Sequence, residues 1–316
     1  MRADSKKVLV TGGAGYIGST LVPELLSAGY SVTVIDDFRY GQTSLLDVCH
    51  NRNLTVVRGD ARDEDLMRRH IEDAEFIIPL ACLVGAPLCE KDPLNARTIN
   101  LGAIELILKL RRPGQKIIYP NTNSGYGRGQ SEVAHCDETT PLEPISLYGR
   151  LKVEAEKILL AAGNTVVFRL ATVFGVSPRM RLDLLVNDFV YRAVNDRSLI
   201  LFEPHFKRNY IHVRDVAAAF LHTMQHFEKM KNEPYNIGLS DANLSKSELC
   251  GEIKKHIPQF VFIESPIGED PDKRNYIVSN AKIEKTGFKT RVSLRDGIEE
   301  LIKGYQVVKR NSFANV

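Results

Sequence analysis

The sequence TGGAGYIG at residues 11–18 gives the clearest indication of the fold. It follows a short apolar run, Lys7 to Thr11, and it opens a segment whose apolar residues recur at helical spacing. In a strand–turn–helix unit, Gly12, Gly15 and Gly18 would allow a tight turn, close approach of the backbone to a pyrophosphate, and close packing of helix on strand. The N–H groups at the start of the helix favour the same anion. The stretch therefore predicts a dinucleotide-binding fold.

An acidic residue ends the second predicted strand and indicates which dinucleotide binds. The run SVTVI at residues 31–35 is rich in β-branched residues, and Asp36 follows it, 18 residues after Gly18. A carboxylate at this place accepts hydrogen bonds from the adenosine ribose hydroxyls and repels a 2′-phosphate. The next position holds Asp37 rather than an arginine, so the pattern favours NAD over NADP.

Strands and helices alternate along the first half of the chain. Short apolar runs are separated by segments with helical spacing, and parallel strands that are buried on both faces have this appearance. The alternation predicts an α/β protein with a Rossmann-type doubly wound parallel sheet. The predicted strands are residues 7–11, 31–35, 54–57, 76–80, 116–119 and 165–170, and the predicted helices are residues 17–27, 64–71, 94–110 and 148–162.

The regular alternation stops near residue 171, where the elements become shorter and prolines more frequent. We therefore expect an NAD-binding Rossmann domain at residues 1–171 and a smaller, mixed α/β substrate-binding lobe at residues 172–316, with segments that interchange between them. A length of 316 residues favours two domains and still allows one large domain.

The composition argues against several classes of function. Forty-two basic residues against 39 acidic ones leave a net charge of +3, without the clustered basic excess of a nucleic-acid-binding protein. No apolar run approaches the 20 or so residues that a membrane-spanning helix needs, and no signal-peptide pattern precedes the glycines, so we expect a cytoplasmic protein. The five cysteines and eight histidines show no metal-ligand spacing, which predicts no metal site.

A second acidic residue, Asp60, follows the third predicted strand in the sequence GDA. It has two interpretations. Its carboxylate lies near the adenine of the cofactor, or it caps the helix that is predicted to begin just after Asp63.

Tyr148 and Lys152 form a YxxxK motif that indicates catalysis. A spacing of four places both side chains on one face of a helix, one turn apart. A nearby ammonium group and a positively charged nicotinamide ring would lower the tyrosine pKa, so that the phenolate removes a proton from a substrate hydroxyl. Thr122 lies in the loop after the fifth predicted strand, at the carboxyl edge of the sheet where ligands bind.

The chain resembles the extended short-chain dehydrogenases/reductases of the NAD-dependent nucleotide-sugar epimerase/dehydratase family. The resemblance rests on TGGAGYIG, LAC (80–82), NSGYG (123–127), YGRLK (148–152) and RNYIHVRDVA (208–217). It implies a Thr122–Tyr148–Lys152 triad in which the tyrosine is the base, the lysine binds the nicotinamide ribose, and hydride passes from sugar C4 to NAD. The cofactor-binding residues that it implies, with those from the motifs, are Gly12, Gly15, Tyr16, Ile17, Gly18, Asp36, Asp37, Asp60, Ala61, Leu80, Ala81, Tyr148 and Lys152.

Two departures from the family pattern narrow the expected chemistry. The 4,6-dehydratases of the family place Asp-Glu directly after the triad threonine, whereas this chain has Asn123 and Ser124. Dehydration is disfavoured because no carboxyl acid or base stands there. The related 3,5-epimerases have a cysteine where this chain has Ser124, so that reaction is disfavoured too. Oxidation at C4 remains, followed by release of the 4-keto sugar or by 4-epimerisation.

Three segments are similar to the GDP-heptose 4-dehydrogenases that supply modified heptoses for bacterial capsular polysaccharide: residues 119–127, 170–189 and 268–274. The resemblance implies a 4-dehydrogenase acting on GDP-heptose or on a GDP- or UDP-hexose. A nucleotide-sugar 4-epimerase is the alternative, and a non-catalytic dinucleotide sensor is a remote one that the intact triad argues against.

The second half is expected to bind the nucleotide-sugar partner. Arg208 matches the diphosphate arginine of the family, Arg274 lies near its C-terminal arginine, and Arg179 and Arg181 could join them. Thr172 stands where the family usually has an asparagine. The substrate-binding residues that we expect are Asn123, Ser124, Thr172, Arg179, Arg208 and Arg274.

The family resemblance also implies a homodimer, formed through a four-helix bundle. The helices would be residues 94–110 and 148–162 of each chain. Their apolar residues permit such a bundle, and the same residues could instead belong to the internal core; they are Leu101, Ile104, Leu108, Ile158 and Leu159.

Overall fold

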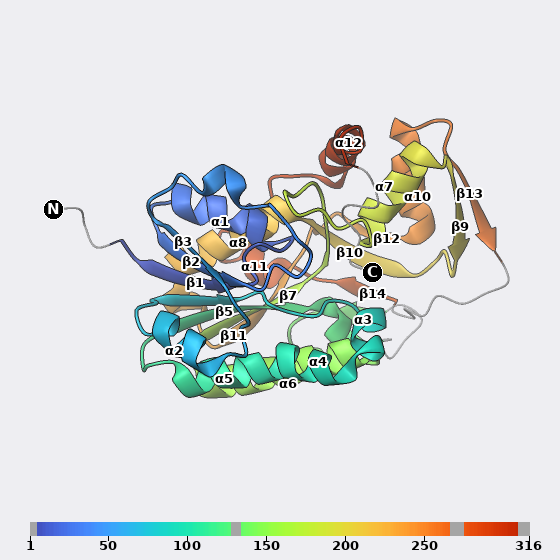
Figure 1. The fold of residues 1–316 in the computed structure, drawn as a ribbon. Coiled ribbons are helices and arrows are strands. Elements are labelled where there is room, and N and C mark those ends of the chain that lie inside the picture. The colour runs from blue at the N-terminus through green and yellow to red at the C-terminus, as the bar shows by residue number, and fades with distance from the viewer. Residues whose placement is uncertain (1–4, 128–133, 266–274, 309–316) are drawn as a thin grey trace.

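A parallel sheet of seven strands forms the centre of the computed structural model, which describes residues 5–127, 134–265 and 275–308. The strand order is β11-β7-β5-β4-β1-β2-β3, and every neighbouring pair is parallel (Figure 1). The predicted doubly wound fold is therefore confirmed. The strands are β1 (Lys7–Thr11), β2 (Ser31–Asp36), β3 (Leu54–Arg58), β4 (Phe76–Pro79), β5 (Lys116–Thr122), β7 (Thr165–Leu170) and β11 (Glu233–Ile237).

The order of the strands reverses at β1. From there the chain adds β2 and β3 on one side and then crosses to β4 and β5 on the other. Helices on opposite faces diverge at such a reversal, so a crevice opens at the carboxyl ends of β1 and β4. The glycine-rich stretch begins at the end of β1 and therefore lies in this crevice.

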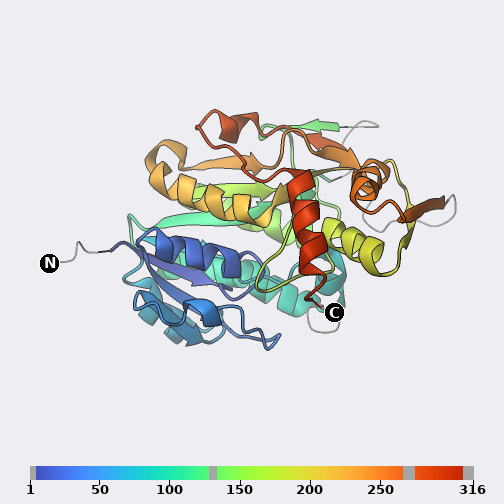
Figure 2. The same cartoon turned by 90° about the horizontal axis from the view of Figure 1, so that it is seen from above.

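Helices cover both faces of the sheet, and alternate residues of each strand supply the two cores. Val8 and Val10 of β1 pack into the core on one face, and Leu9 packs into the core on the other. Figures 1 and 2 show α1 (Gly18–Ser27) and α8 (Val213–Gln225) side by side over the first face. The second face is covered by α2 (Glu64–Ile71), α5 (Ala103–Leu110) and α6 (Leu147–Ala162).

The single helix predicted at residues 94–110 is interrupted. It consists of α4 (Pro93–Arg97), the π-helical segment η2 (Thr98–Gly102) and α5, and it follows the short helix α3 (Ala86–Lys91). Asn100 lies in the π-helical segment. Its side chain accepts a hydrogen bond from Leu83 N at 2.8 Å and donates one to Leu83 O at 2.9 Å. The irregular turn thus anchors the segment that follows β4, a role that periodicity of apolar residues does not reveal.

The second half of the chain contributes to both parts of the molecule. Its strand β11 pairs with β7 at the edge of the main sheet, so residues on both sides of position 171 build that sheet. Small sheets and helices form the rest. They comprise β8 (Thr172–Phe174), β10 (Lys207–His212) and β12 (Asn243–Ser245) in one sheet, β9 (Ser198–Phe202) with β13 (Val261–Ser265), β6 (Ala134–Cys136) with β14 (Tyr276–Val278), and the helices α7 (Leu185–Asn195), α9 (Phe227–Met230), α10 (Lys246–His256), α11 (Ala281–Glu284) and α12 (Leu294–Gly304).

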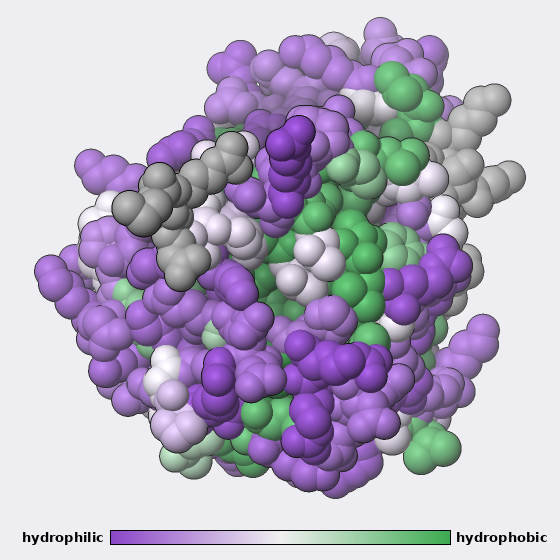
Figure 3. Space-filling model, turned by 60° about the vertical axis from the view of Figure 1, so that its left-hand side comes forward, coloured by the Kyte–Doolittle hydropathy of each residue, from purple (hydrophilic) through white to green (hydrophobic). Residues whose placement is uncertain are grey.

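One face of the molecule is mainly polar (Figure 3). Figure 3 shows a face covered mostly by hydrophilic residues, with apolar side chains gathered in a hollowed band near its middle. Among the described residues, no helix combines the length and the apolar character needed to cross a bilayer.

Candidate functional site

A cavity of about 1140 Å³ opens at the carboxyl ends of the main-sheet strands. It is lined by residues from both halves of the chain, and it brings together all of the predicted site residues that the structure describes. Arg274, with the segment 268–274 that contains it, lies outside the described residues. The cavity therefore joins the glycine-rich loop, the predicted triad and the predicted substrate arginines in one space.

The glycine-rich loop packs against the end of β4 more closely than a side chain would allow. Gly12 has a φ of +70°, and a Cβ atom there would lie 2.5 Å from Ala81 N. A Cβ atom on Gly18 would lie 2.5 Å from Gly13 Cα. Helix α1 begins at Gly18, and no side chain among the described residues caps its first turn. This uncapped helix start beside close-packed glycines fits the pyrophosphate of a dinucleotide.

Asp36 is buried at the far end of the same cavity, with 7% of its surface exposed. Its carboxylate accepts hydrogen bonds from Ala14 N at 2.9 Å, from Phe38 N at 2.9 Å and from Gln42 Nε2 at 3.1 Å. Burial raises the pKa of this carboxyl group. A carboxylate offers about four acceptor positions, so capacity remains for a ribose hydroxyl. Asp36 thus also holds the glycine-rich loop in place, which sequence spacing did not reveal.

Asp37 and Asp60 both line the cavity, and each pairs with an arginine. Arg39 Nη2 lies 2.6 Å from Asp37, and Arg62 Nη2 lies 2.5 Å from Asp60. The hydrogen bond from Arg62 lowers the pKa of Asp60. The carboxylate of Asp63, not that of Asp60, caps α2, so the helix-cap interpretation of Asp60 is wrong.

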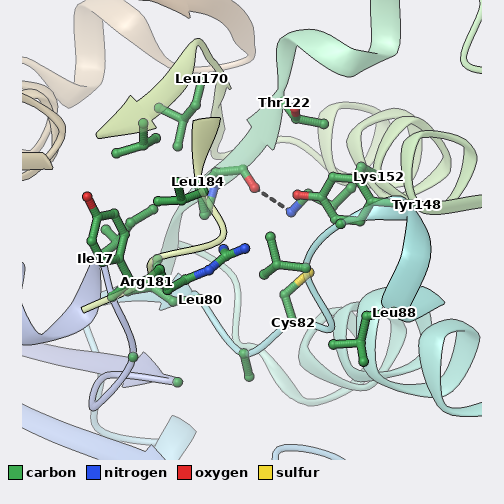
Figure 4. A pocket seen from close by; sticks show the side chains of 18 of the residues that line it. Ile17, Leu80, Cys82, Leu88, Thr122, Tyr148, Lys152, Leu170, Arg181 and Leu184 are labelled. Atoms are coloured by element: carbon green, nitrogen blue, oxygen red, sulfur yellow. Dashed lines mark hydrogen bonds between the residues drawn. The ribbon is translucent and has the colours of Figure 1, made fainter. Parts of the chain in front are cut away.

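The residues that are predicted to form the triad come together from two elements. Tyr148 and Lys152 project from α6 into the cavity beside Thr122, which ends β5 (Figure 4). The α6 helix begins at a serine cap, because Ser146 Oγ accepts a hydrogen bond from Gly149 N at 3.1 Å. The hydroxyl groups of Thr122 and Ser124 lie 2.9 Å apart.

Lys152 is almost completely buried, with 4% exposed. Its ammonium group donates to Pro120 O, drawn as the dashed line in Figure 4, and lies 3.9 Å from the centre of the Tyr119 ring. Burial lowers the lysine pKa. The carbonyl oxygen and the ring face offset part of the cost of burying this charge, because both present negative potential to the ammonium group.

A buried ion pair that was not predicted from the sequence lies in the interior next to the predicted triad. Arg169 on β7 and Glu156 on α6 are 5% and 3% exposed, and Arg169 Nη2 lies 2.7 Å from Glu156 Oε1. The other oxygen of Glu156 accepts a hydrogen bond from the Asn121 amide, whose own oxygen accepts from Thr122 N at 2.8 Å. In the sequence, the pair could have been suspected only from the four-residue spacing of Lys152 and Glu156, which places both charges on one face of the same helix.

The predicted substrate residues line the rest of the cavity. Asn123 is 3% exposed, and its side-chain amide has no hydrogen-bond partner among the described residues. Thr172 begins β8, and Arg208 of β10 is 2% exposed and donates to Lys207 O at 2.9 Å. Arg179 lines the cavity near the glycine-rich loop, where its guanidinium group packs 4.8 Å from the centre of the Tyr40 ring.

Comparison with known proteins identifies the family. Residues 8–238 match the model of the NAD dependent epimerase/dehydratase family. The chain belongs to this family. The prediction of an NAD-dependent enzyme of this group is thereby confirmed.

Individual relatives can be aligned with almost the whole chain. A putative UDP-glucose 4-epimerase of Methanocaldococcus jannaschii is 28% identical over 93% of this chain and 97% of its own length. UDP-glucuronic acid decarboxylase 1 of Arabidopsis thaliana is 26% identical, covering 95% of this chain and 70% of its own length. The crystal structure of a UDP-glucose 4-epimerase from Thermotoga maritima with UDP-glucose superimposes with a TM-score of 0.84 at 26% identity, covering 95% of this chain and 98% of that one.

The buried ion pair yields a first prediction. Glu156→Gln leaves the Arg169 charge buried without its carboxylate, which we expect to lower the free energy of unfolding by about 3–5 kcal/mol. Urea denaturation followed by circular dichroism measures this change. Glu154→Gln on the same helix is the control: Glu154 is exposed and lies 4.0 Å from Arg97, so its loss should cost less than about 1 kcal/mol. If both substitutions lowered the free energy of unfolding equally, the Glu156–Arg169 ion pair would not have the structural role assigned to it.

The environment of Asp36 yields a second prediction. Asp36→Asn should weaken NAD binding roughly tenfold or more, because a neutral amide accepts a weaker hydrogen bond than a carboxylate, and it should reduce the rejection of NADP. Calorimetric titration of cofactor-free protein with NAD and NADP gives both affinities. Asp73→Asn serves as the control, because its carboxylate is paired with Lys7 and does not line the cavity. An unchanged NAD to NADP ratio in Asp36→Asn would show that another group selects the cofactor.

Proposed function

We propose that this protein oxidises the C4 hydroxyl group of a nucleoside-diphosphate sugar, using NAD as the hydride acceptor and Tyr148 as the base. The observation that carries the proposal is the shared cavity, in which the glycine-rich loop faces Thr122, Tyr148 and Lys152. A sugar seated beside the triad would have the hydroxyl group of C4 next to the tyrosine and its ring next to the nicotinamide. The assembled triad also argues against a non-catalytic dinucleotide sensor.

Each triad residue has a defined part in this reaction. The Thr122 hydroxyl group holds the substrate hydroxyl by a hydrogen bond, and the Tyr148 phenolate removes its proton. The charge of Lys152 stabilises the phenolate, and the Pro120 carbonyl and Tyr119 ring hold the ammonium group in position. NAD, when bound, takes up the hydride that leaves C4. One proton and one hydride thus leave the alcohol and yield the 4-keto sugar.

The residues after Thr122 support oxidation without dehydration. Elimination of water from the sugar needs an acid and a base beside the ring. Asn123 and Ser124 occupy the two positions, and neither side chain exchanges protons near neutral pH. The unpartnered Asn123 amide instead offers a donor and an acceptor to a sugar hydroxyl group.

Two fates of the 4-keto sugar follow from this chemistry. The names of two relatives favour 4-epimerisation, in which hydride returns to the opposite face of C4. The segments at residues 119–127 and 170–189 favour release of the keto sugar, as in a 4-dehydrogenase acting on GDP-heptose or on a GDP- or UDP-hexose. In both cases we assign the sugar diphosphate to Arg208, whose buried guanidinium group lines the cavity from β10. Thr172 lies at the start of the neighbouring strand, β8.

Product analysis tests the proposal. Purified protein is incubated with GDP- and UDP-sugars, with and without a keto-acid acceptor, and the sugars are analysed by NMR. A C4 epimer without net NADH supports the epimerase, whereas a 4-keto sugar with NADH, or with reduced acceptor, supports the dehydrogenase. Failure to form either product from any sugar of both nucleotide series would contradict C4 oxidation.

Two tyrosine variants serve as controls for this experiment. Tyr148→Phe should reduce turnover at least about a hundredfold, the usual contribution of a general base, and should still bind NAD. Tyr30→Phe, which does not line the cavity, should leave turnover unchanged. Activity that survives in Tyr148→Phe would assign the proton transfer to another group.

The homodimer remains a prediction. Leu101, Ile104 and Leu159 are buried in the core of the single chain, so they do not support an interface. Leu108 and Ile158 are half-buried, and Leu94 on α4 is 74% exposed, so these three apolar side chains are available to a partner. Light scattering of the purified chain should give about twice 35.4 kDa, and a mass of one chain at micromolar concentration would contradict the dimer.

A further inference from the structure

The loop at residues 175–184, between β8 and α7, lies directly against the glycine-rich loop. Tyr16 Oη donates to Gly175 O at 2.8 Å, and Ser177 Oγ donates to Tyr16 O at 2.7 Å. Ser19, in the first turn of α1, lies with its hydroxyl oxygen 2.9 Å from that of Ser177. Arg179 N also donates to Ser19 Oγ at 3.2 Å. The 175–184 loop is thereby attached to the part of α1 that begins the predicted pyrophosphate site.

Helix α7 holds the other side of the 175–184 loop. Asn187 is fully buried, and its side chain accepts from Gly175 N at 3.0 Å and donates to Arg181 O at 2.9 Å. Met180 and Leu182 pack into the main hydrophobic core. The conformation of the loop is therefore determined by packing on both sides, and the side chain of Arg181 is directed by it.

Arg181 projects into the cavity from this loop. Its side chain is 11% exposed, and Figure 4 shows its guanidinium group extending toward Cys82 and Tyr148. It lies near enough to Tyr16 and Tyr148 for its charge to interact with both hydroxyl groups. The guanidinium group thus lies between the glycine-rich loop and the predicted triad. A dinucleotide that reached from one to the other would lie beside it.

The hydrogen bonds of Arg181 leave one side of its guanidinium group for a ligand. Asp183 accepts from Nε at 3.2 Å and from Nη2 at 2.5 Å, which orients the planar group. The structure places no partner on Nη1 among the described residues. The 175–184 loop carries Arg179, Arg181 and Asp183, and so a net charge of +1. Arg181 and the uncapped start of α1 line the same cavity, and positive potential from both suits a diphosphate.

We propose that the 175–184 loop forms part of the dinucleotide site beside the glycine-rich loop, and that Arg181 binds the cofactor diphosphate from this loop. The inference rests on the proposed function only in its choice of NAD as the ligand. Arg181 then acts with the N–H groups of α1, and Asp183 keeps its guanidinium group in register. Because the loop is packed on both sides, its contact with the cofactor would slow release of NAD and NADH alike.

The test measures binding without substrate, so that its result is independent of the reaction at C4. Cofactor-free wild-type protein and Arg181→Ala are titrated with NAD, ADP-ribose, adenosine, UDP and GDP. We expect Arg181→Ala to weaken NAD and ADP-ribose about tenfold or more and to leave adenosine, UDP and GDP within about twofold. The amount of NAD that stays with the protein through desalting should fall in parallel.

Two variants distinguish a ligand contact from loss of structure. Arg181→Lys keeps the charge without the planar fork, so we expect an intermediate loss of NAD affinity at unchanged thermal stability. Arg295→Ala removes an exposed arginine on α12 and should change neither property. Weaker UDP or GDP binding with unchanged NAD binding would assign Arg181 to the sugar nucleotide and overturn the proposal. Unchanged binding of every ligand in a folded Arg181→Ala protein would overturn it as well.

Discussion

The close contact between the glycine-rich loop and the end of β4 is the constraint on which the site depends. A Cβ atom at Gly12 would lie 2.5 Å from Ala81 N, so the two segments meet backbone to backbone. Their contact lies where the strand order reverses, and the adjoining crevice is therefore available to a ligand. Asn100 and Asp36 reinforce it through hydrogen bonds to Leu83 and to Ala14. The cavity, the helix start and the triad are all positioned relative to this junction.

Helix α6 carries two residues of the proposed triad, Tyr148 and Lys152, and two buried charges, Lys152 and Glu156. It presents Tyr148 to the cavity and encloses Lys152 and Glu156 in the interior. Each buried charge has a partner of opposite potential: a carbonyl oxygen and a ring for the lysine, and Arg169 for the glutamate. Burying ion pairs is seldom a net source of stability. The Glu156–Arg169 pair is linked by hydrogen bonds through Asn121 to Thr122. We infer that the pair holds Thr122 in position rather than adding net stability.

The sequence predicted the features that depend on local pattern. Apolar runs and helical spacing identified six strands of the main sheet and located α1, α2 and α6 closely, because both patterns arise from residues a few positions apart. The glycine spacing, Asp36 and the Tyr148–Lys152 pair could be recognised for the same reason. The π-helical segment was not predicted, since Asn100 is held there by Leu83, 17 residues away. Asp60 had two interpretations until the capping of α2 by Asp63 was seen.

The fold class and the family follow from the sequence, and so do the residues proposed for the triad, because the motifs that identify them span only a few positions. The folded structure was needed to show that Arg169 is connected to the proposed triad, and where Arg179 and Arg181 lie. The 175–184 loop meets Tyr16 and Ser19 across about 160 positions of chain. The spacing of apolar residues cannot predict a contact over that separation. Two arginines that are two residues apart also look equivalent in the sequence. Packing against α1 and α7 makes them different, because it directs one toward Tyr40 and the other toward Tyr148.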